Sequence, residues 1–280
     1  MDKEIWDDMA IDYDKSVEDN QDPIIFNYLK KEIEILTTLC NRVYDSNKNC
    51  SIIDMGAGTG RVIFALDEKL QGNAIKFYGI EVSEPMLNHA NQKKQNYKDV
   101  SKIEFLKFDL TDENLSEYFQ SDDTNIVMCL YNTLGVIPSD KRQKFINNMK
   151  SIAGEKGLTI ITTFNGDDFG FVAPKLYNPM MPMIKQIDQD SFDERNRVFQ
   201  NGLGFRSQWF TKNELKSMLD TNVEPIPINV TINDTSYTFG NVFVDRNVWA
   251  LLVKDVLEVR DFHMDEYFHL HLHMFQYGIS

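Results

Sequence analysis

Apolar positions along the chain follow two spacings in turn, one typical of strands and one typical of helices. The strand-like segments are short and mostly apolar, at residues 51–55, 75–80, 102–108, 125–130 and 157–164. Helical spacing precedes and separates them, at residues 23–43, 61–70, 84–95, 116–119 and 139–152, the last with Ser139 as its expected N-cap. This alternation predicts a mainly parallel, doubly wound α/β sheet with helices on both faces. Ligands of such folds lie at the carboxyl ends of the strands.

The regular alternation ends at residue 164. Residues 165–208 are rich in Asp, Asn, Met and aromatic side chains, which indicates an insertion. Helical spacing returns at 211–219, where Thr211 and Glu214 match a capping box, and strands are expected at 226–232 and 247–254. We therefore expect one domain over residues 1–280. Its parts are N-terminal helices (1–47), a Rossmann-like core (48–164 and 209–255), the insertion (165–208) and a C-terminal extension (256–280).

Composition and charge narrow the class of function. Apolar residues make up 42% and charged residues 26% of the 280 positions, as is usual for a globular chain with a sizeable core. The net charge is −14 and no cluster of Lys and Arg is visible, which argues against a nucleic-acid substrate. No apolar run reaches the roughly 20 residues of a membrane-spanning helix, so we expect no membrane partner. The acidic start argues against a secretory signal, and three cysteines without disulfide or metal spacing favour the cytoplasm.

A glycine-rich loop follows the first predicted strand. Residues 54–60 read Asp-Met-Gly-Ala-Gly-Thr-Gly and lead into a predicted helix. Glycines in such a loop let the backbone turn sharply and bring its N–H groups close to a ligand. A nicotinamide fingerprint needs a glycine where the chain has Arg61, and a P-loop needs Gly-Lys followed by Ser or Thr. The spacing therefore argues against both of those loop types.

Acidic residues end the next two predicted strands. Glu81 lies about twenty residues past the loop, where a carboxylate can accept hydrogen bonds from both hydroxyls of a ribose. Asp109 follows the third strand and could meet an adenine amino group. Each feature alone is weak, since a glycine turn and an exposed acid are common. Three of them at successive strand ends together predict a site for a nucleoside-containing ligand.

These motifs resemble those of the class I S-adenosylmethionine-dependent methyltransferases. Residues 52–61, 79–87, 108–110 and 130–132 are similar to the first four motifs of that family, and 208–211 and 249–253 fit its later elements. The resemblance covers 48–164 well and 208–254 loosely. It implies a seven-stranded sheet whose last strand is antiparallel. It also implies S-adenosylmethionine as cofactor and S-adenosylhomocysteine as product.

The resemblance further implies roles for single residues. The loop backbone would hold the methionine portion of the cofactor and Glu81 its ribose, while Asp109, Met86 and Leu110 would surround its adenine. Family members often close an N-terminal aromatic segment over the cofactor, and Trp6 and Tyr13 look like that segment, with plain packing of an N-terminal helix as the alternative. The full set expected at the cofactor is Tyr13, Asp54, Gly56, Ala57, Gly58, Thr59, Gly60, Arg61, Glu81, Val82, Met86, Asp109, Leu110 and Leu130.

The end of the fourth strand bears on the methyl acceptor. Family members that methylate planar amino groups of bases or amides usually carry Asn/Asp/Ser-Pro-Pro-Tyr/Phe there, whereas residues 130–135 read Leu-Tyr-Asn-Thr-Leu-Gly. We therefore expect transfer to N or O of a small molecule. Because the cofactor supplies most of the reactivity, no fixed catalytic residue is required. The catalytic candidates are Tyr131, Asn132 and His271.

The insertion lies where the family carries substrate-covering segments. Its aromatic and acidic residues would suit an amine or cationic acceptor, with ordinary core packing as the alternative, and Arg206 would instead suit a carboxylate. The residues expected at the acceptor are Trp6, Asn132, Phe164, Tyr177 and Arg206.

Four histidines fall in the last eighteen residues, and the last three alternate along the chain. On a strand they would share one face, which fits a metal site, a wall of the substrate pocket or the polar side of an edge strand. We expect no resident metal. Two other functions stay open, a methyltransferase acting on protein or RNA and a catalytically silent nucleotide-binding or regulatory protein of the same fold. The histidines are His263, His269, His271 and His273.

Overall fold

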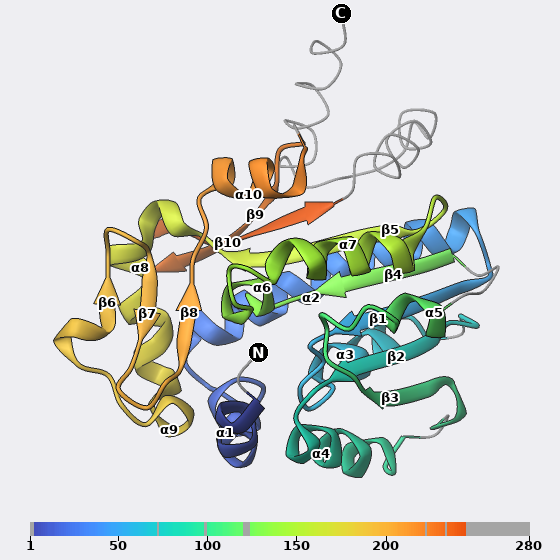
Figure 1. Ribbon diagram of the computed structural model, residues 1–280, viewed down its shortest axis with the longest axis horizontal. Coiled ribbons are helices and arrows are strands. Elements are labelled where there is room, and N and C mark those ends of the chain that lie inside the picture. The colour runs from blue at the N-terminus through green and yellow to red at the C-terminus, as the bar shows by residue number, and fades with distance from the viewer. Residues whose placement is uncertain are drawn as a thin grey trace, which may run out of the picture.

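A seven-stranded sheet forms the centre of the computed structural model, which describes residues 3–71, 73–97, 100–119, 124–221, 223–232 and 234–244 (Figure 1). Its strand order is β3-β2-β1-β4-β5-β10-β9. The strands β1 to β5 pair in parallel, and β10 lies antiparallel between β5 and β9. The prediction of a Rossmann-like sheet with its last strand antiparallel is confirmed. The strands are β1 Cys50–Met55, β2 Lys76–Glu81, β3 Ile103–Lys107, β4 Thr124–Cys129, β5 Leu158–Phe164, β9 Ile226–Ile232 and β10 Thr235–Val244.

The antiparallel strand β10 is one that the sequence pattern did not predict. It occupies Thr235–Val244, whereas the predicted strand at 247–254 lies outside the described residues. Gly240 and Asn241 interrupt its apolar pattern, and both are poor strand formers. Tyr28 explains the glycine, because a Cβ at position 240 would lie 2.8 Å from its ring. A register shift between Thr238 and Gly240 further obscures the pattern.

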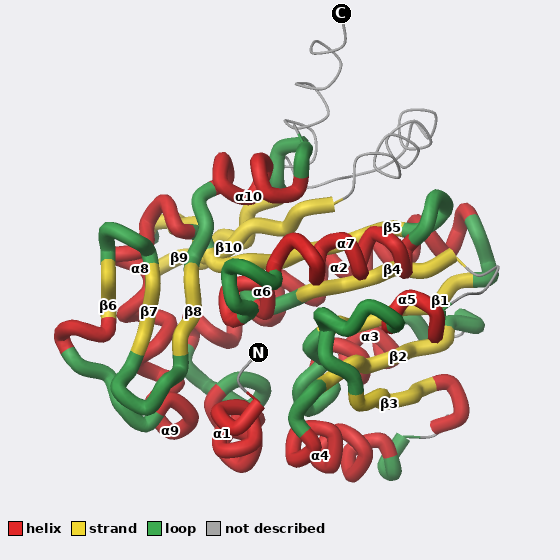
Figure 2. The backbone as a smooth tube through the Cα atoms, in the orientation of Figure 1, coloured by secondary structure: helices red, strands yellow, loops and turns green. Residues whose placement is uncertain are grey.

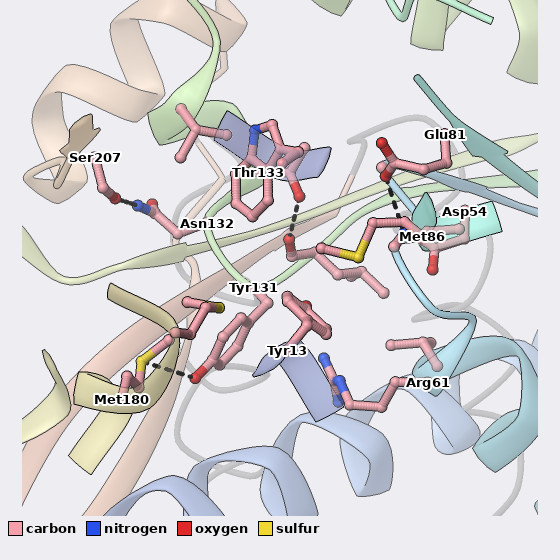
Figure 3. A pocket seen from close by; sticks show the side chains of 18 of the residues that line it. Tyr13, Asp54, Arg61, Glu81, Met86, Tyr131, Asn132, Thr133, Met180 and Ser207 are labelled. Atoms are coloured by element: carbon pink, nitrogen blue, oxygen red, sulfur yellow. Dashed lines mark hydrogen bonds between the residues drawn. The ribbon is translucent and has the colours of Figure 1, made fainter. Parts of the chain in front are cut away.

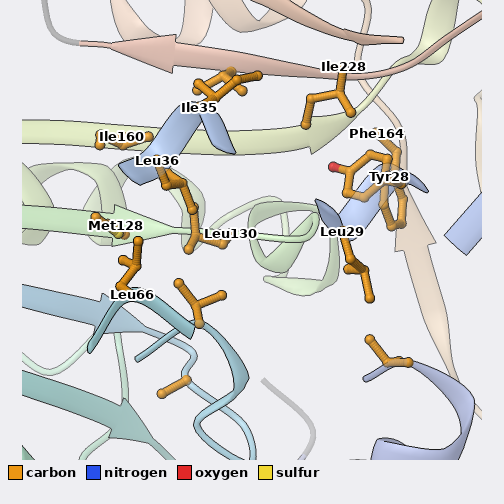
Figure 4. Packing of buried hydrophobic residues seen from close by; sticks show 14 of the residues in the cluster. Tyr28, Leu29, Ile35, Leu36, Leu66, Met128, Leu130, Ile160, Phe164 and Ile228 are labelled. Carbon is orange, nitrogen blue, oxygen red and sulfur yellow. The ribbon is translucent and has the colours of Figure 1, made fainter. Parts of the chain in front are cut away.

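Helices cover both faces of this sheet (Figures 1 and 2). Neighbouring residues of a strand point to opposite faces, and Ile52 and Ile53 of β1 accordingly join two separate apolar cores. Ile52 belongs to the core formed with α2 and α3, part of which Figure 4 shows, and Ile53 to the core formed with α7 and α10. The helices are α1 Lys3–Ser16, α2 Pro23–Ser46, α3 Arg61–Lys69, α4 Glu84–Lys94, α5 Leu115–Tyr118, α6 Thr133–Val136, α7 Arg142–Ala153, α8 Phe169–Tyr177, α9 Met181–Ile184 and α10 Lys212–Leu219.

Two predicted helix caps have different outcomes. Thr211 and Glu214 form the capping box at the start of α10, as predicted. Ser139 does not cap α7, which begins at Arg142 after a residue that makes no side-chain cap. The reason is a turn, closed by a 2.9 Å hydrogen bond from the Lys141 N–H to the Pro138 carbonyl, which delays the helix.

The insertion folds beside the carboxyl ends of β4 and β5. It contains α8, α9 and a small antiparallel sheet of β6 (Phe192–Asp193), β7 (Val198–Gln200) and β8 (Arg206–Gln208), visible on the left of Figure 2. Aromatic side chains hold it together. Tyr177 stacks on Phe199 with ring centroids 4.1 Å apart, and its hydroxyl accepts a 2.9 Å hydrogen bond from Trp209 Nε1.

No helix in the described part of the chain is long and apolar enough to cross a membrane.

Candidate functional site

The glycine loop lies at the carboxyl end of β1, where the strand order reverses between β1 and β4. Sheets of this kind bind ligands at such a point. Gly56, Gly58 and Gly60 all have positive φ, at 95°, 54° and 84°. The N–H groups of Gly56 and Ala57 donate to the Ile80 carbonyl at 2.8 and 3.0 Å, which fixes the loop against β2. The loop therefore needs its glycines for backbone geometry as well as for space.

Glu81 at the end of β2 lies under this loop. Its Oε2 accepts a 3.0 Å hydrogen bond from the Gly58 N–H, and its Oε1 accepts from the N–H groups of Val82 and Ser83 at 2.8 and 2.9 Å. Burial raises the pKa of Glu81, although these three hydrogen bonds oppose the shift. A carboxylate offers about four lone-pair positions, so the side chain keeps room for further donors.

Asp54 at the end of β1 is a buried acid without a partner. Its Oδ1 has no hydrogen bond in the described structure, and 3% of the residue is exposed. Burial raises its pKa to about 7, and the nearby Glu32 and Glu81 add to the shift while Arg61 opposes it. A buried acid left unpaired is costly for a fold. Asp54 lines the cavity described below, so this cost points to a function.

Arg61, the first residue of α3, forms a buried ion pair with Glu32 of α2. The Nη2–Oε2 distance is 2.9 Å, and both side chains are less than 10% exposed. The Oε1 of Glu32 accepts a 2.6 Å hydrogen bond from the Thr162 hydroxyl of β5. The Arg61 guanidinium also lies 5.4 Å from the ring centroid of Tyr131. This pair therefore connects the glycine loop to the ends of β4 and β5.

The two residues after β4 have an unusual backbone. Tyr131 and Asn132 both have positive φ, at 49° and 64°, a region that side chains with a Cβ rarely adopt. Hydrogen bonds hold them there: the Tyr131 N–H donates to the Thr162 hydroxyl at 2.8 Å, and Asn132 Oδ1 accepts from the Phe164 N–H at 3.1 Å. Asn132 Nδ2 donates to the Ser207 hydroxyl at 2.9 Å. The ring of Tyr131 is thereby held in the cavity wall.

Helix α1 packs against the glycine loop from the other side. The Thr59 hydroxyl donates to Asp14 Oδ1 at 2.5 Å, and Lys93 of α4 lies 2.8 Å from Asp14 Oδ2. The Ser83 hydroxyl donates to Asp7 Oδ1 at 2.6 Å. A Cβ on Gly58 would lie 3.7 Å from the ring of Tyr13. The helix thus covers the loop and contributes to the same cavity.

These elements enclose one cavity, shown in Figure 3. Asp54, Glu81 and Met86 gather on one side of it, and Tyr131 and Met180 lie on the other. The structure brings together in its wall these residues predicted at the cofactor, at the acceptor or as catalytic candidates: Trp6, Tyr13, Asp54, Gly56, Ala57, Gly58, Arg61, Glu81, Met86, Leu130, Tyr131, Asn132, Phe164 and Tyr177. The same wall contains residues that the predicted sets lack, namely Val62, Thr133, Val136, Met180, Met183, Phe205 and Ser207.

Several predicted site residues lie outside this wall. Thr59, Gly60 and Val82 support the loop, and Leu110 lies in the apolar core around α7. Asp109 Oδ1 accepts hydrogen bonds from the N–H and hydroxyl of Thr111 at 2.8 and 2.7 Å. Partial burial raises the pKa of Asp109, but these two hydrogen bonds outweigh it, so that the pKa is lowered overall.

The two remaining predicted residues are an arginine and a histidine. Arg206 is exposed and lines a second, outer groove together with Ser139 and Asp140. His271, like the three histidines near it, lies outside the described residues. In the part of the chain that is described, no cluster of three His, Cys, Asp or Glu residues could hold a metal ion.

The missed wall residues differ in what the sequence could have revealed. Thr133 and Val136 follow Asn132 by one and four residues, so their position next to a predicted site residue could have indicated them. Ser207 lies on β8 and Phe205 directly before it, and this segment reaches the cavity only because the insertion folds back onto the core. No local pattern in the sequence indicates that contact.

Comparison with known proteins identifies the family. A family model described as a methyltransferase domain matches residues 46–222. A carboxy-S-adenosyl-L-methionine synthase of Desulfotalea psychrophila is 31% identical over 108 residues, which cover 39% of this chain and 38% of that protein. The match thus spans well under half of the length of that relative.

Solved structures share the fold. An S-adenosylmethionine-dependent methyltransferase from Anabaena variabilis superposes with a TM-score of 0.53 at 14% identity, covering 86% of this chain and 91% of that one. Another from Clostridium acetobutylicum gives a TM-score of 0.51 at 15% identity, covering 84% and 96%. The family model spans more than half of the chain, and the sheet order and glycine loop agree with it. The chain therefore belongs to the S-adenosylmethionine-dependent methyltransferases of class I.

Proposed function

We propose that this methyltransferase transfers the methyl group of S-adenosylmethionine to a nitrogen or oxygen atom of a small-molecule acceptor. One observation carries the proposal: the glycine loop with its two buried acids and an aromatic wall line the same cavity. The aromatic wall consists of Trp6, Tyr131, Phe164, Tyr177 and Phe205, beside Met180 and Met183. Such a wall suits the organic part of a small molecule and attracts a positive charge.

The residues of the loop side fit the cofactor. The unpaired Oδ1 of Asp54 offers an acceptor for an ammonium group, and Glu81 can still accept hydrogen bonds from ribose hydroxyls. Gly58 brings its backbone into the wall without a side chain. We assign the methionine portion to the loop, the ribose to Glu81 and one face of the adenine to Met86. When bound, the cofactor supplies a sulfonium methyl group that a nucleophile can displace in line.

The acceptor side has positioning as its main task. Holding an acceptor in line and excluding water together account for much of the rate in such displacements. We assign this task to the rigid backbone at Tyr131 and Asn132 and to the aromatic lid of the insertion. The amide of Asn132 is engaged by Ser207 and Phe164, so it shapes the wall. The phenol of Tyr131 donates to Met180 Sδ at 3.8 Å, a weak acceptor that a bound methyl acceptor could replace.

The bulk properties support a small acceptor in a reducing compartment. The net charge of −14 disfavours a nucleic-acid substrate. The three cysteines are free and buried, which suits the cytoplasm. We propose that residues 1–47 act as a cofactor lid and 165–208 as the acceptor cover of one domain.

Binding measurements test the cofactor assignments. We expect calorimetric titration to show micromolar binding of S-adenosylmethionine and S-adenosylhomocysteine. NADH and ATP, titrated alongside as comparison ligands, should not bind. Gly58→Arg should abolish binding, because the new side chain would project past the Tyr13 ring and fill the cavity. Glu81→Ala should weaken it about 10-fold or more, the effect of losing charge-assisted hydrogen bonds. The exposed Glu117→Ala is the matched control, and binding of NADH or ATP instead would overturn the assignment.

An acceptor screen then tests the reaction. The panel consists of amines, phenols and small acids, and the measured product is the nucleoside, identified by mass. S-Adenosylhomocysteine formed only with an acceptor supports methyl transfer. A carboxylated form of S-adenosylmethionine would favour the activity for which the Desulfotalea psychrophila relative is named. Cofactor binding without either product over the whole panel counts for the silent nucleotide-binding alternative.

A further inference from the structure

A second hollow adjoins the cavity on the side of the acceptor. It has a volume of about 450 Å³ and opens to the surface between the start of α1, the turn before α7 and β8. Trp6, Val136 and Phe205 line both the cavity and this outer groove. The rings of Trp6 and Phe205 meet edge to face, with centroids 5.9 Å apart. An acceptor longer than the cavity would therefore extend past these two rings into the groove.

One arginine, Arg206, lines the groove, and a second, Arg142, is buried nearby. Arg206 is exposed, and its side chain makes no hydrogen bond or ion pair with another described residue. Arg142 lies behind it and is buried, and its guanidinium donates to Gln208 Oε1 at 2.7 Å and to the Ile137 carbonyl at 2.9 Å. These partners are neutral, so the positive charge of Arg142 is not balanced by them.

The positive charges of Arg206 and Arg142 repel each other. Burial lowers the pKa of Arg142 to about 10, and repulsion by Arg206 contributes to the shift. Asp140 also lines the groove but forms no ion pair with Arg206 in the described structure. An anion held by Arg206 would relieve the repulsion between the two guanidinium groups.

The alternation of β8 explains why this arginine faces outward. Neighbouring residues of a strand point to opposite sides, so Ser207 lines the inner cavity while Arg206 lines the groove. A planar guanidinium matches a carboxylate through two parallel hydrogen bonds. On the basis of the proposed function, we propose that the groove binds a carboxylate on the tail of the methyl acceptor through Arg206. The methyl-accepting end would then lie among the aromatic rings of the cavity.

Chain-length probes test this assignment without knowledge of the natural acceptor. The probes are phenylpropanoate, phenylpentanoate and phenylheptanoate, each paired with its own primary amide. Each is titrated calorimetrically into the full-length protein saturated with S-adenosylhomocysteine. At the best chain length we expect the acid to bind about tenfold more tightly than its amide, as a charge-assisted hydrogen bond allows.

Substitutions assign the preference to one side chain. Arg206→Gln should reduce the affinity for the acid to that for the amide and leave the amide unchanged. Arg206→Lys should retain part of the preference, and Asp140→Asn should increase it. Arg195→Gln, at an exposed arginine of the turn between β6 and β7, is the matched control and should change nothing.

The outcomes separate this inference from the proposed function. If S-adenosylhomocysteine does not bind the unaltered protein, the proposed function fails, and the inference fails with it. If it binds and no acid exceeds its amide, the carboxylate subsite alone is wrong. A preference for the acid that persists in Arg206→Gln also overturns the assignment to Arg206.

Discussion

At the scale of single residues, Asp54 makes stability and function oppose each other. Its pKa is raised by burial from the ordinary value of 3.8 to about 7. Between these two pH values the folded protein holds a proton that the unfolded chain has lost, so the free energy of unfolding falls as the pH rises. The unpaired carboxylate that suits a cofactor ammonium thus destabilises the empty protein at neutral pH.

Asp54→Asn should therefore stabilise the cofactor-free protein at pH 8. We expect a gain in the free energy of unfolding on the order of 1–3 kcal/mol at pH 8 and little change at pH 4, where the native carboxyl is already neutral. Urea denaturation at both pH values measures the difference, with the exposed Asp19→Asn as control. A gain that is equal at the two pH values would contradict the role of the ionised carboxylate.

Gly60 shows two separate reasons for a glycine in the loop, its positive φ and the lack of space for a Cβ. Its φ is 84°, and a Cβ there would lie 2.7 Å from atoms of both Phe64 and Phe105. Gly58 in the same loop has a φ of 54°, and a Cβ there would lie no closer than 3.7 Å to the ring of Tyr13. Gly60→Ala should cost about 2–4 kcal/mol of stability and Gly58→Ala about 1 kcal/mol, because only the first adds a clash to the backbone strain. Equal losses in urea denaturation would show that the two rings move aside freely.

At the scale of elements, a cluster of charged side chains joins α1 to α4, beside the apolar contacts that Met9 and Ala10 of α1 make with the core. Lys93 of α4 pairs with Asp14 near the end of α1 and with Glu18 just after it. These groups are partly exposed, so their attraction is modest and sensitive to salt. Loss of these ion pairs therefore weakens the attachment of α1 to α4 and leaves the apolar contacts of Met9 and Ala10 in place.

Lys93→Met should accelerate the release of the cofactor. We expect the dissociation rate to rise up to about fivefold at low salt, as the loss of partly exposed ion pairs allows, and to become nearly independent of salt. Stopped-flow measurements at low and high NaCl concentration give both quantities. Lys107→Met removes an ion pair with Glu84 that does not involve α1, and it should leave the rate unchanged. A salt dependence that survives in Lys93→Met would refute the attachment through this lysine.

The elements show where sequence patterns suffice. The alternating core from β1 to β5 was predictable, because each strand is apolar and each helix separates two strands. The strand β10 was not predicted, since Gly240 packs against Tyr28 and Asn241 pairs with β5, and both interrupt its apolar pattern. The insertion strands have only two or three residues each, too few for any period to show.

The candidate site divides in the same way. The loop residues and Glu81 were predictable because each follows a strand directly, and parallel strands bring their ends together. The environment of Asp109 depends on a local turn with Thr111, and that of Arg206 depends on the side of β8 from which it projects. Neither is encoded in a short motif, so residue type alone could not place these two side chains.

At the scale of the whole molecule, Glu32 connects the layers around the switch point. It joins α2 to α3 through Arg61 and to β5 through Thr162, and all three side chains are buried. Removing one partner of a buried ion pair leaves the other charge without compensation, which typically costs about 3–5 kcal/mol. The same buried ion pair therefore stabilises both the glycine loop and the end of β5.

A double-mutant cycle measures this connection. Glu32→Gln and Arg61→Met should each destabilise the fold by about 3–5 kcal/mol, and the double variant should lose at least about 2 kcal/mol less than their sum. Urea denaturation provides the values. The exposed pair of Lys144 and Glu113 is the control, with an expected coupling of about 0.5 kcal/mol. Additive losses for Glu32 and Arg61 would mean that they act independently.

The position of α1 bears on the order of events in turnover. Tyr13 of this helix lies against the glycine loop, and Trp6 forms part of the wall between the cavity and the outer groove. The way out for a spent cofactor and the way in for an acceptor thus run past the same helix. One movement of this helix would control both. Each catalytic cycle should then contain a single opening, with the cofactor as the first molecule to enter and its demethylated product as the last to leave.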